Sequence, residues 1–274
     1  MVDGNSLINR AFYATTLTNG ATYGFLNMFL RAVENTNCTH IAVAFDMREP
    51  TFRHKLYDKY KAHRHPMPAD LVRQFADLKS ILKDMEIKTF EIPTFEADDI
   101  IGTLATKSPM QTAILTGDRD AFQIVSDKIS IHLTRNTGIE IIDSARILND
   151  YGVEPKQLVD VKALMGDKSD NIPGASGVGE KTALKIIKEH GCIENSEYAT
   201  DKQVLMSKQL AKINCEVPLD VDFNALKWHL PMSKRVFDAF KSRNFNSFLN
   251  RNGWFPSIEQ MNKPKQISMF EGGF

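Results

Sequence analysis

The chain has 274 residues, and its 34 lysines and arginines are balanced by 34 aspartates and glutamates, which gives a formal net charge of zero at pH 7. Apolar residues make up 42% of the sequence and charged residues 25%, values that are ordinary for a globular protein and exclude bulk disorder or a collagen-like chain. Taken alone, the zero balance argues against a nucleic-acid partner, because phosphate binding favours a basic surface.

The length corresponds to one large domain or two small ones. The sequence has no run of 18 apolar residues and no basic flank followed by an apolar stretch at its start, so we expect no membrane contact and no secretory signal. Its three cysteines, Cys38, Cys192 and Cys215, are widely spaced, which fits a reduced cytoplasmic location and no zinc site.

Short apolar runs alternate with stretches of helical periodicity over the first 145 residues. The predicted strands are residues 41–45, 87–92, 112–115, 129–133 and 138–142. Two helices are predicted from apolar stripes, one through Phe25, Leu26, Phe29, Leu30 and Val33, the other through Leu71, Phe75, Leu78, Leu82 and Met85. This alternation predicts an α/β fold, with a central, mostly parallel sheet flanked by helices over residues 1–145. Only Met1 and Val2 precede Asp3, so the first strand is either short or the end of a longer one.

The strand signal fades from about residue 146. The predicted helical segments there are residues 155–165, 179–190, 201–213 and 231–249. We therefore expect a helical region over residues 146–255, packed on the α/β core, and a flexible tail over residues 256–274.

Acidic side chains follow the predicted strands. Asp3, Asp46 and Asp118 come at or just after the ends of apolar runs, and a further group opens the helix that begins near residue 97. The candidate metal ligands are Asp3, Asp46, Glu96, Asp98, Asp99, Asp118, Asp120, Asp167 and Asp170. Because sites in a parallel sheet form at the carboxyl ends of the strands, we expect these acids to meet at one edge.

So many carboxylates in one place require neutralisation, because each close pair costs roughly 1–4 kcal/mol. A ligand set made only of oxygens suits Mg²⁺ or Mn²⁺ and argues against zinc. Two such ions, about 4 Å apart, support phosphodiester hydrolysis by activating a water and stabilising the leaving oxygen. The alternative is that the acids cap helices and turns, which is the better interpretation for any one of them but a poor one for four separate stretches.

The densest basic segment is residues 53–65, with five lysines and arginines, three histidines, two tyrosines and one acid. Aromatic side chains among cations are typical of base stacking combined with phosphate contact. A solvated helix face is the alternative. The position of the segment directly after Asp46 favours a phosphate-binding element beside the metals.

Residues 172–183 form a second candidate for phosphate binding. They superficially resemble a nucleotide-binding loop, but Glu180 stands between Gly179 and Lys181, where the Walker pattern requires Gly-Lys in sequence. A tight hairpin between two helices is favoured, because its glycines allow backbone amides to approach a phosphate at the start of the next helix. Such helix–hairpin–helix units bind the DNA backbone without sequence readout, although a plain turn between helices is the alternative.

Together these motifs resemble the 5′ nuclease family, that is, flap endonucleases and the 5′→3′ exonuclease domain of bacterial DNA polymerase I. The matching pieces occur in the family's order and are Val2-Asp3-Gly4-Asn5, Phe45-Asp46, Phe52-Arg53-His54, Tyr60-Lys61-Ala62-His63-Arg64, Phe95-Glu96-Ala97-Asp98-Asp99, Thr116-Gly117-Asp118-Arg119-Asp120, and Gly166-Asp167-Lys168-Ser169-Asp170-Asn171 running on through Lys181-Thr182-Ala183.

The resemblance implies a PIN-like core, a helical arch over about residues 50–75 and a helix–three-turn–helix motif over about residues 160–190. It implies a Mg²⁺-dependent enzyme that cleaves branched or 5′-ended DNA and removes flaps or RNA primers, including primers in hybrid with DNA, in replication and repair. Because no polymerase follows residue 274, we expect a stand-alone, monomeric nuclease of phage or bacterial type.

The resemblance also assigns roles to the candidate residues. One metal site would use Asp46, Glu96 and Asp98, with Asp3 nearby; the other would use Asp118, Asp120, Asp167 and Asp170, with Asp98 as a bridge and Asp99 as a further acid. The catalytic residues would be Lys61, Arg64, Asp46, Asp98 and Asp118. DNA contacts would come from Arg53, Tyr60, Lys61, Arg64, Gly174, Gly177, Gly179, Lys181 and Thr182. A potassium ion at the hairpin of residues 172–179 is also implied.

The tail contains Gln266-Ile267-Ser268-Met269-Phe270, which resembles the pentapeptide that binds the bacterial sliding clamp. Two rival functions stay open. One is an acid-rich single-strand ribonuclease of related fold, which would lack the hairpin and the arch; the other is a non-enzymatic DNA-binding scaffold.

The zero net charge hides local segregation. Residues 53–65 hold five basic groups against one acid, and residues 91–120 hold six acids against two basic groups. If metal ions cover those acids, the charge argument against nucleic acid fails, because it counted the ligands without the metals.

Overall fold

The computed structural model describes residues 1–257 and 261 of the chain. Within this part, six strands form one sheet in the order β3-β2-β1-β4-β5-β6. The strands are β1 (Val2–Asp3), β2 (Ala42–Ala44), β3 (Lys88–Phe90), β4 (Thr112–Thr116), β5 (Ile129–Arg135) and β6 (Gly138–Ile142). All neighbours pair in parallel except β5 and β6, which form an antiparallel pair. The predicted α/β class with a mostly parallel sheet is confirmed.

The helices of the described part are α1 (Gly4–Ala14), α2 (Gly20–Thr36), α3 (Phe52–Leu56), α4 (Ala69–Asp84), α5 (Ala97–Lys107), α6 (Ser144–Tyr151), α7 (Leu158–Met165), α8 (Glu180–His190), α9 (Lys202–Ala211), α10 (Lys234–Ser242) and α11 (Asn246–Leu249). The sequence analysis did not predict α1 and α6. Each begins at an aspartate whose side chain accepts a hydrogen bond from a backbone N–H of the first turn, Ser6 for Asp3 and Arg146 for Asp143.

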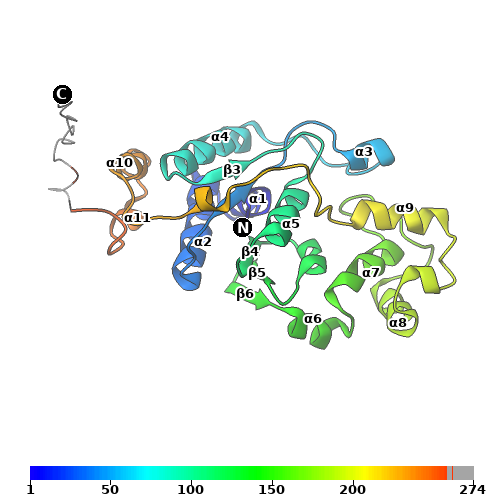
Figure 1. Cartoon of the computed structure of the whole chain (residues 1–274). Helices are drawn as coiled ribbons and strands as arrows, with labels where there is room; N and C mark the ends of the chain where they lie inside the picture. The colour runs from blue at the N-terminus through cyan, green and yellow to red at the C-terminus, as the bar shows by residue number, and fades with distance from the viewer. Residues whose placement is uncertain (258–260, 262–274) are drawn as a thin grey trace, which may run out of the picture.

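Successive side chains of each strand point to opposite faces of the sheet, and each face carries its own core. Val43 and Leu115 lie in the core that α1, α2 and α4 cover, whereas Ala42 and Ile114 lie in the core that α5 covers. Figure 1 shows α2 and α4 on one side of the strands and α5 on the other. The central strands β1 and β2 are buried on both faces, which is typical of a parallel sheet.

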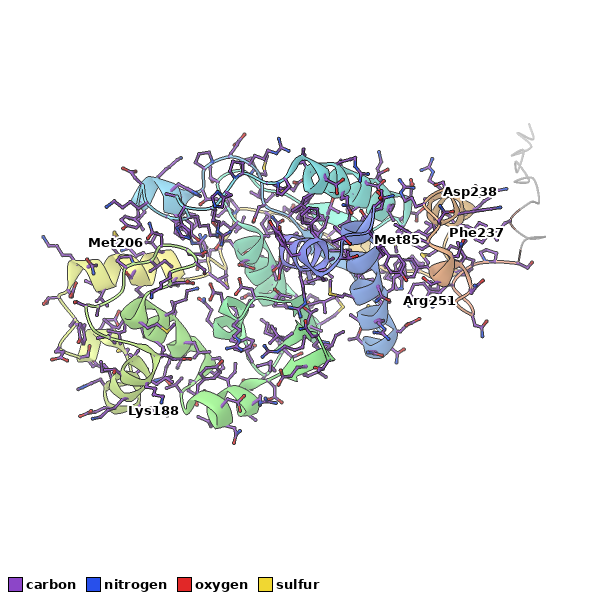
Figure 2. The ribbon with its side chains drawn as sticks, turned by 180° about the vertical axis from the view of Figure 1, so that it is seen from behind. Met85, Lys188, Met206, Phe237, Asp238 and Arg251 are labelled. Carbon is purple, nitrogen blue, oxygen red and sulfur yellow. The ribbon has the colours of Figure 1, made fainter. Side chains whose placement is uncertain are left out.

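The helical second half does not pack as one body. Helices α7, α8 and α9 surround a separate core that includes Leu164, Ile187 and Val204. In contrast, Phe240 and Phe248 of α10 and α11 join the core formed by α1, α2 and α4. Figure 1 shows α10 and α11 at the opposite end of the molecule from α8 and α9, and Figure 2 shows the same separation from behind. The helices of residues 146–255, predicted as one region, therefore pack in separate places. The boundary near residue 145 stays a prediction.

The predicted arch over residues 50–75 is helical only toward its ends. It comprises α3, a series of turns between residues 58 and 63, an extended segment and the start of α4. The turns are anchored to the rest of the fold, because the backbone N–H of Lys61 donates to the Asp170 carbonyl at 2.9 Å. A continuous helical arch is therefore not what this chain forms in the structure.

A close backbone approach forms the hairpin between α7 and α8. Residues Asp167 and Ile172 exchange two backbone hydrogen bonds of 2.8 Å each. Gly174 has a φ of +65°, and a Cβ at this position would lie 2.4 Å from the nitrogen of Gly166, so only glycine fits here. From α9, Ser207 accepts a hydrogen bond from the Gly174 N–H and Gln203 donates one to its carbonyl. The hairpin is consequently fixed by three helices.

In the described part of the chain, no helix is long and apolar enough to cross a membrane. The clamp-like segment Gln266–Phe270 and nearly all of the predicted tail lie outside the described residues.

Candidate active site

A cavity of about 180 Å³ opens at the carboxyl ends of β1, β2 and β4. Strand ends, the start of α5 and the α7–α8 hairpin all contribute to its walls, as expected for a site in a parallel sheet. Seven of the nine predicted metal ligands line it, namely Asp3, Asp46, Glu96, Asp98, Asp118, Asp120 and Asp170. Lys61 and Arg64 line it as well, so segments that are far apart in the sequence meet here.

Three aspartates converge at one side of this cavity. Asp120 begins the 3₁₀ turn after β4, and Asp167 and Asp170 come from the hairpin after α7. One carboxylate oxygen from each lies within 4.8 Å of the others. A compact set of carboxylate oxygens fits a hard divalent cation such as Mg²⁺. Asp118, which was predicted for the same site, lies next to them, and its Oδ1 accepts a hydrogen bond of 2.9 Å from the Asp120 N–H.

The acids predicted for the other metal site surround the cavity more loosely. Asp46 accepts a hydrogen bond of 2.7 Å from the Ala97 N–H, and Glu96 accepts one of 2.9 Å from Lys61. Among the described residues, these acids do not form a group as compact as the three aspartates. They share the cavity with that group, so the structure brings members of both predicted sets to one place.

Burial and the repulsion between neighbouring carboxylates raise the pKa values of three acids in the cavity. Burial, together with Asp46 and Asp118, raises the pKa of Asp3 to about 7. Burial and the carboxylates of Asp3 and Asp118 raise the pKa of Asp98 well above its usual range. For Asp120, burial is again the main cause and the pKa rises to about 6. A bound cation would relieve this repulsion, which supports the fit of the site to metal ions.

Thr116 is a component of the site that the motifs did not indicate. It is 1% exposed at the end of β4, and its hydroxyl donates to Asp3 Oδ2 at 2.7 Å. The hydroxyl oxygen of Thr116 also accepts a hydrogen bond of 3.0 Å from the Asp118 N–H. Thr116 therefore orients two of the acids at once. A buried threonine in a strand is common, so the sequence carried no signal for this role.

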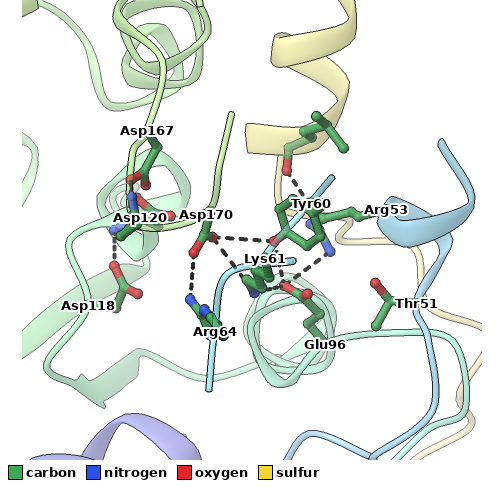
Figure 3. A network of polar contacts seen from close by, with 12 residues as sticks. Thr51, Arg53, Tyr60, Lys61, Arg64, Glu96, Asp118, Asp120, Asp167 and Asp170 are labelled. Atoms are coloured by element: carbon green, nitrogen blue, oxygen red, sulfur yellow. Dashed lines mark hydrogen bonds and ion pairs between the residues drawn. The ribbon is translucent and has the colours of Figure 1, made fainter. Parts of the chain in front are cut away.

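Lys61 and Arg64 lie where the turns after α3 meet the cavity (Figure 3). Nζ of Lys61 lies 2.9 Å from Glu96 Oε2 and 3.7 Å from Asp170 Oδ2. The guanidinium of Arg64 is half exposed and pairs with Asp170 Oδ1 at 2.5 Å. Both cations are thus held beside the candidate metal ligands, where a phosphate could reach them.

Asp99 and Arg53, predicted as a metal ligand and a DNA contact, bind each other in the structure. Asp99 has no exposed surface, and its two oxygens accept hydrogen bonds of 2.7 and 2.8 Å from the Arg53 guanidinium. Arg53 is 3% exposed and also donates to the carbonyls of Leu210 and Lys212 at the end of α9. In this structure both carboxylate oxygens of Asp99 are taken up by Arg53, and the Arg53 guanidinium is buried at the cavity wall. Together they join α3, α5 and the end of α9 at the wall of the cavity.

Tyr60 was also predicted to contact DNA, but its side chain is 2% exposed. Its hydroxyl donates toward Glu96 at 3.1 Å and toward Asp170 at 3.4 Å. Burial, together with these two acids, raises the pKa of the phenol, so it stays a hydrogen-bond donor. Tyr60 accordingly positions acids and offers no face for base stacking.

The predicted DNA contacts of the hairpin have two different environments. Gly174 is buried, whereas Gly177 and Gly179 are exposed and have open space where a Cβ would be. Lys181 and Thr182 are exposed in the first turn of α8. The exposed group presents backbone and a cation at a helix N-terminus, an arrangement suited to phosphate.

Lys162 is a second residue that the sequence analysis missed. It lies in the last turn of α7, and its Nζ pairs with Asp120 and, at 2.7 Å, with Asp167 Oδ2. These acids raise the pKa of its ammonium group. A lysine five residues before an aspartate has no recognisable spacing, since the two meet only because the hairpin turns back.

Comparison with known families and proteins agrees with this geometry. The family model described as the 5′-3′ exonuclease N-terminal resolvase-like domain matches residues 1–152, and the model for the 5′-3′ exonuclease C-terminal SAM fold matches residues 153–234. DNA polymerase I of Bacillus subtilis is 36% identical over 92% of this chain, and the thermostable DNA polymerase I of Thermus filiformis is 38% identical over 92%. The chain spans about a third of the length of these relatives, 32% and 33% respectively.

Solved structures share the fold at lower identity. A structure of the 5′-exonuclease of bacteriophage T5 with divalent metal ions (zinc) has a TM-score of 0.64 and 22% identity, covering 88% of this chain and 97% of that one. The catalytic core of Rad2 in complex with DNA substrate has a TM-score of 0.62 and 16% identity, covering 91% of this chain and 90% of that one.

Proposed function

Because the chain belongs to the 5′-3′ exonuclease family, we propose that it is a structure-specific 5′ nuclease, with flap endonuclease and 5′→3′ exonuclease activity on DNA. It would remove 5′ flaps or RNA primers during replication and repair. The observation that carries the proposal is one cavity that seven acids line together with Lys61 and Arg64.

Two Mg²⁺ ions are the cofactors that best fit the cavity. Asp120, Asp167 and Asp170 would hold one ion, with Asp118 beside them, and Asp46, Glu96 and Asp98 would hold the other. When bound, the ions supply Lewis-acid activation of water and neutralise charge on the leaving oxygen. The solved T5 structure contains zinc, but the oxygen-only ligands of this chain favour Mg²⁺ or Mn²⁺.

The residues of the chain itself bind and orient the substrate. Lys61 and Arg64 would donate to the scissile phosphate and stabilise the charge that grows on it in the transition state. Both cations are preorganised by Glu96 and Asp170, so no large movement is needed when the phosphate arrives. Asp3 and Thr116 keep the neighbouring carboxylates oriented.

The α7–α8 hairpin would bind the duplex backbone. The exposed glycines, Lys181 and Thr182 offer amides and a cation, and a K⁺ ion coordinated by the carbonyls of residues 172–179 would add to the grip. Asp167 and Asp170 belong to the same loop, so DNA bound at the hairpin would be held at a fixed offset from the cavity.

The decisive experiment compares substrates with the purified protein and Mg²⁺. The proposal predicts cleavage of 5′-flap DNA and little action on single-stranded RNA, whereas a single-strand ribonuclease would show the reverse preference. Asp118→Asn is the matched inactive variant, because Asp118 is exposed to the cavity and its loss should not disturb the fold. If the protein bound flap DNA without cleaving it, the nuclease proposal would fail and a DNA-binding scaffold would be the remaining function.

We also propose that the protein is a monomer and that Gln266–Phe270 binds a sliding clamp. Deletion of residues 266–270 should leave cleavage of free flap DNA unchanged and weaken any association with a clamp.

A further inference from the structure

Lys162 lies at the three-aspartate site of the cavity. Its Nζ pairs with Asp120 and with Asp167, whose Oδ2 is 2.7 Å away. Only 12% of its side chain is exposed, so solvent screens these ion pairs weakly. A lysine ammonium group carries its positive charge at neutral pH.

The carboxylates that Lys162 neutralises are those that a divalent cation would use. A cation on the same oxygens must either displace the ammonium group or bind beside it against like-charge repulsion. We propose that Lys162 is a built-in competitor that lowers the affinity of this site for divalent cations, and so raises the metal concentration at which the nuclease becomes active. The inference rests on the proposed function.

Two of the three aspartates, Asp167 and Asp170, have other partners that hold their side chains. Asp167 Oδ1 accepts hydrogen bonds from the N–H and the hydroxyl of Ser169, at 2.7 and 2.6 Å. Asp170 has its own cation, Arg64, at 2.5 Å. Removal of Lys162 should therefore leave the ligand oxygens in place while it removes the competing charge.

The direct test measures the binding of Mn²⁺ to the metal-free protein in the absence of DNA, with electron paramagnetic resonance as the readout. Lys162→Met keeps the length of the side chain without its charge and should bind Mn²⁺ roughly ten-fold more tightly at one site, which corresponds to about 1.4 kcal/mol. Lys162→Arg keeps the charge and should stay close to the wild type.

Lys168→Met is the matched control, because Lys168 is exposed and follows Asp167 directly in the chain. It removes the same charge nearby and should change Mn²⁺ affinity much less than Lys162→Met does. The double variant Lys162→Met/Asp167→Asn should lose the gain, which assigns the gain to this site. Far-ultraviolet circular dichroism and thermal melting verify that each variant is folded.

An unchanged or weaker Mn²⁺ affinity in folded Lys162→Met would overturn the inference, as would a gain that survives the Asp167 substitution. The same measurements separate this inference from the proposed function. Tighter Mn²⁺ binding in a protein that cleaves no flap DNA would refute the nuclease and keep the competitor. Active nuclease with unchanged Mn²⁺ binding would refute only the competitor.

Discussion

Arg53 and Asp99 form a buried, bidentate ion pair, with nitrogen–oxygen distances of 2.7 and 2.8 Å. Arg53 lies in the wall of the cavity and also approaches Glu96 Oε2 at 3.6 Å. Asp99 in turn accepts hydrogen bonds from the N–H groups of Glu96 and Asn214. Two residues that the family resemblance places in substrate and metal binding thus act as a joint between the α/β core and α9.

Arg53→Met should destabilise the protein by about 3–5 kcal/mol, because it leaves the Asp99 carboxylate buried without its counter-charge. Urea unfolding monitored by circular dichroism measures this loss. The double variant Arg53→Met/Asp99→Leu should lose less than the sum of the two single variants, because no uncompensated charge remains.

Arg73→Met provides the matched control. Arg73 pairs with Asp70 at 2.6 Å, but both side chains are more than half exposed. The unfolding midpoint should hardly move, since water and salt screen an exposed pair. Equal losses for Arg53→Met and Arg73→Met would contradict the joint described above.

Thr116→Val keeps the shape of the side chain and removes the hydroxyl that joins Asp3 to Asp118. The change should cost about 1–3 kcal/mol of stability, because a buried carboxylate oxygen and an N–H group lose their partner. It should also weaken Mg²⁺ binding, measured by calorimetry, since the acids lose their common orientation. Thr116→Ser keeps the hydroxyl and should retain most of both the stability and the Mg²⁺ affinity. Wild-type stability and Mg²⁺ affinity in Thr116→Val would show that packing matters and the hydrogen bonds do not.

The core and the strand-end acids were predictable because short-range patterns encode them. Apolar runs of four to six residues marked the strands, and the acids that follow them reached one edge because the strands are parallel. The motif spacing also located the hairpin between α7 and α8. Helix α1 was missed because its start signal, Asp3, had already been assigned to metal binding.

Burial inside polar networks was not predictable from the sequence. Arg53, Tyr60 and Asp99 have the composition of a substrate-binding surface, yet Arg53 and Asp99 are buried by contacts with residues 210–214, at and just after the end of α9. The position of Lys162 in the site was not predictable either, because only the fold of the hairpin brings it to Asp167. Side-chain type and spacing thus indicated the chemistry of the site, whereas tertiary contacts decided which residues face it.

Lys61→Met should slow single-turnover cleavage of flap DNA by about 10²–10³-fold, because a preorganised cation at the phosphate is lost. The dissociation constant for DNA should change far less, since the hairpin provides separate backbone contacts. Rapid-quench kinetics and fluorescence anisotropy measure the two quantities. Lys59→Met, an exposed lysine two residues away, is the control and should cleave at the wild-type rate. A wild-type rate for Lys61→Met would exclude the role given to it.

The stability of the metal-free protein should fall as the pH rises from about 4 to about 7. Asp3 and Asp120 have pKa values raised to about 7 and about 6, so the folded protein binds more protons than the unfolded chain in this range. The unfolding free energy then has a negative slope with pH, and the contribution of the protonated acids is lost through their folded-state pKa values. Melting temperatures in EDTA at pH 5 and pH 7.5 measure the effect.

Mg²⁺ should reverse this trend at pH 7.5, because the ion stabilises the ionised acids and binds only the folded state. An increase in melting temperature at pH 7.5 that exceeds the increase at pH 5 is expected. Asp120→Asn removes one of the titrating acids and should flatten the slope in EDTA. A metal-free protein whose stability increases steadily from pH 5 to pH 7.5 would show that the acids are ionised without a cation.

Two glycines of the hairpin have the same backbone handedness but different surroundings. Gly174 and Gly177 both have positive φ values, +65° and +75°, so alanine is strained by roughly 1–2 kcal/mol at either position. Only at Gly174 would the new Cβ collide with backbone, 2.4 Å from Gly166 N and 2.7 Å from the Leu164 carbonyl. Gly174→Ala should therefore force Gly166 and the following Asp167 to shift.

Gly174→Ala should weaken both Mn²⁺ binding and affinity for flap DNA, because one loop carries the metal ligands and the backbone amides. Gly177→Ala carries the same strain into open space, so its Mn²⁺ affinity should stay close to the wild type while DNA binding falls only slightly. Unfolding in urea shows whether each variant keeps its fold. If both variants lost metal binding equally, strain alone would explain the effect, and the close approach of Gly174 to Gly166 would have no part in holding the site.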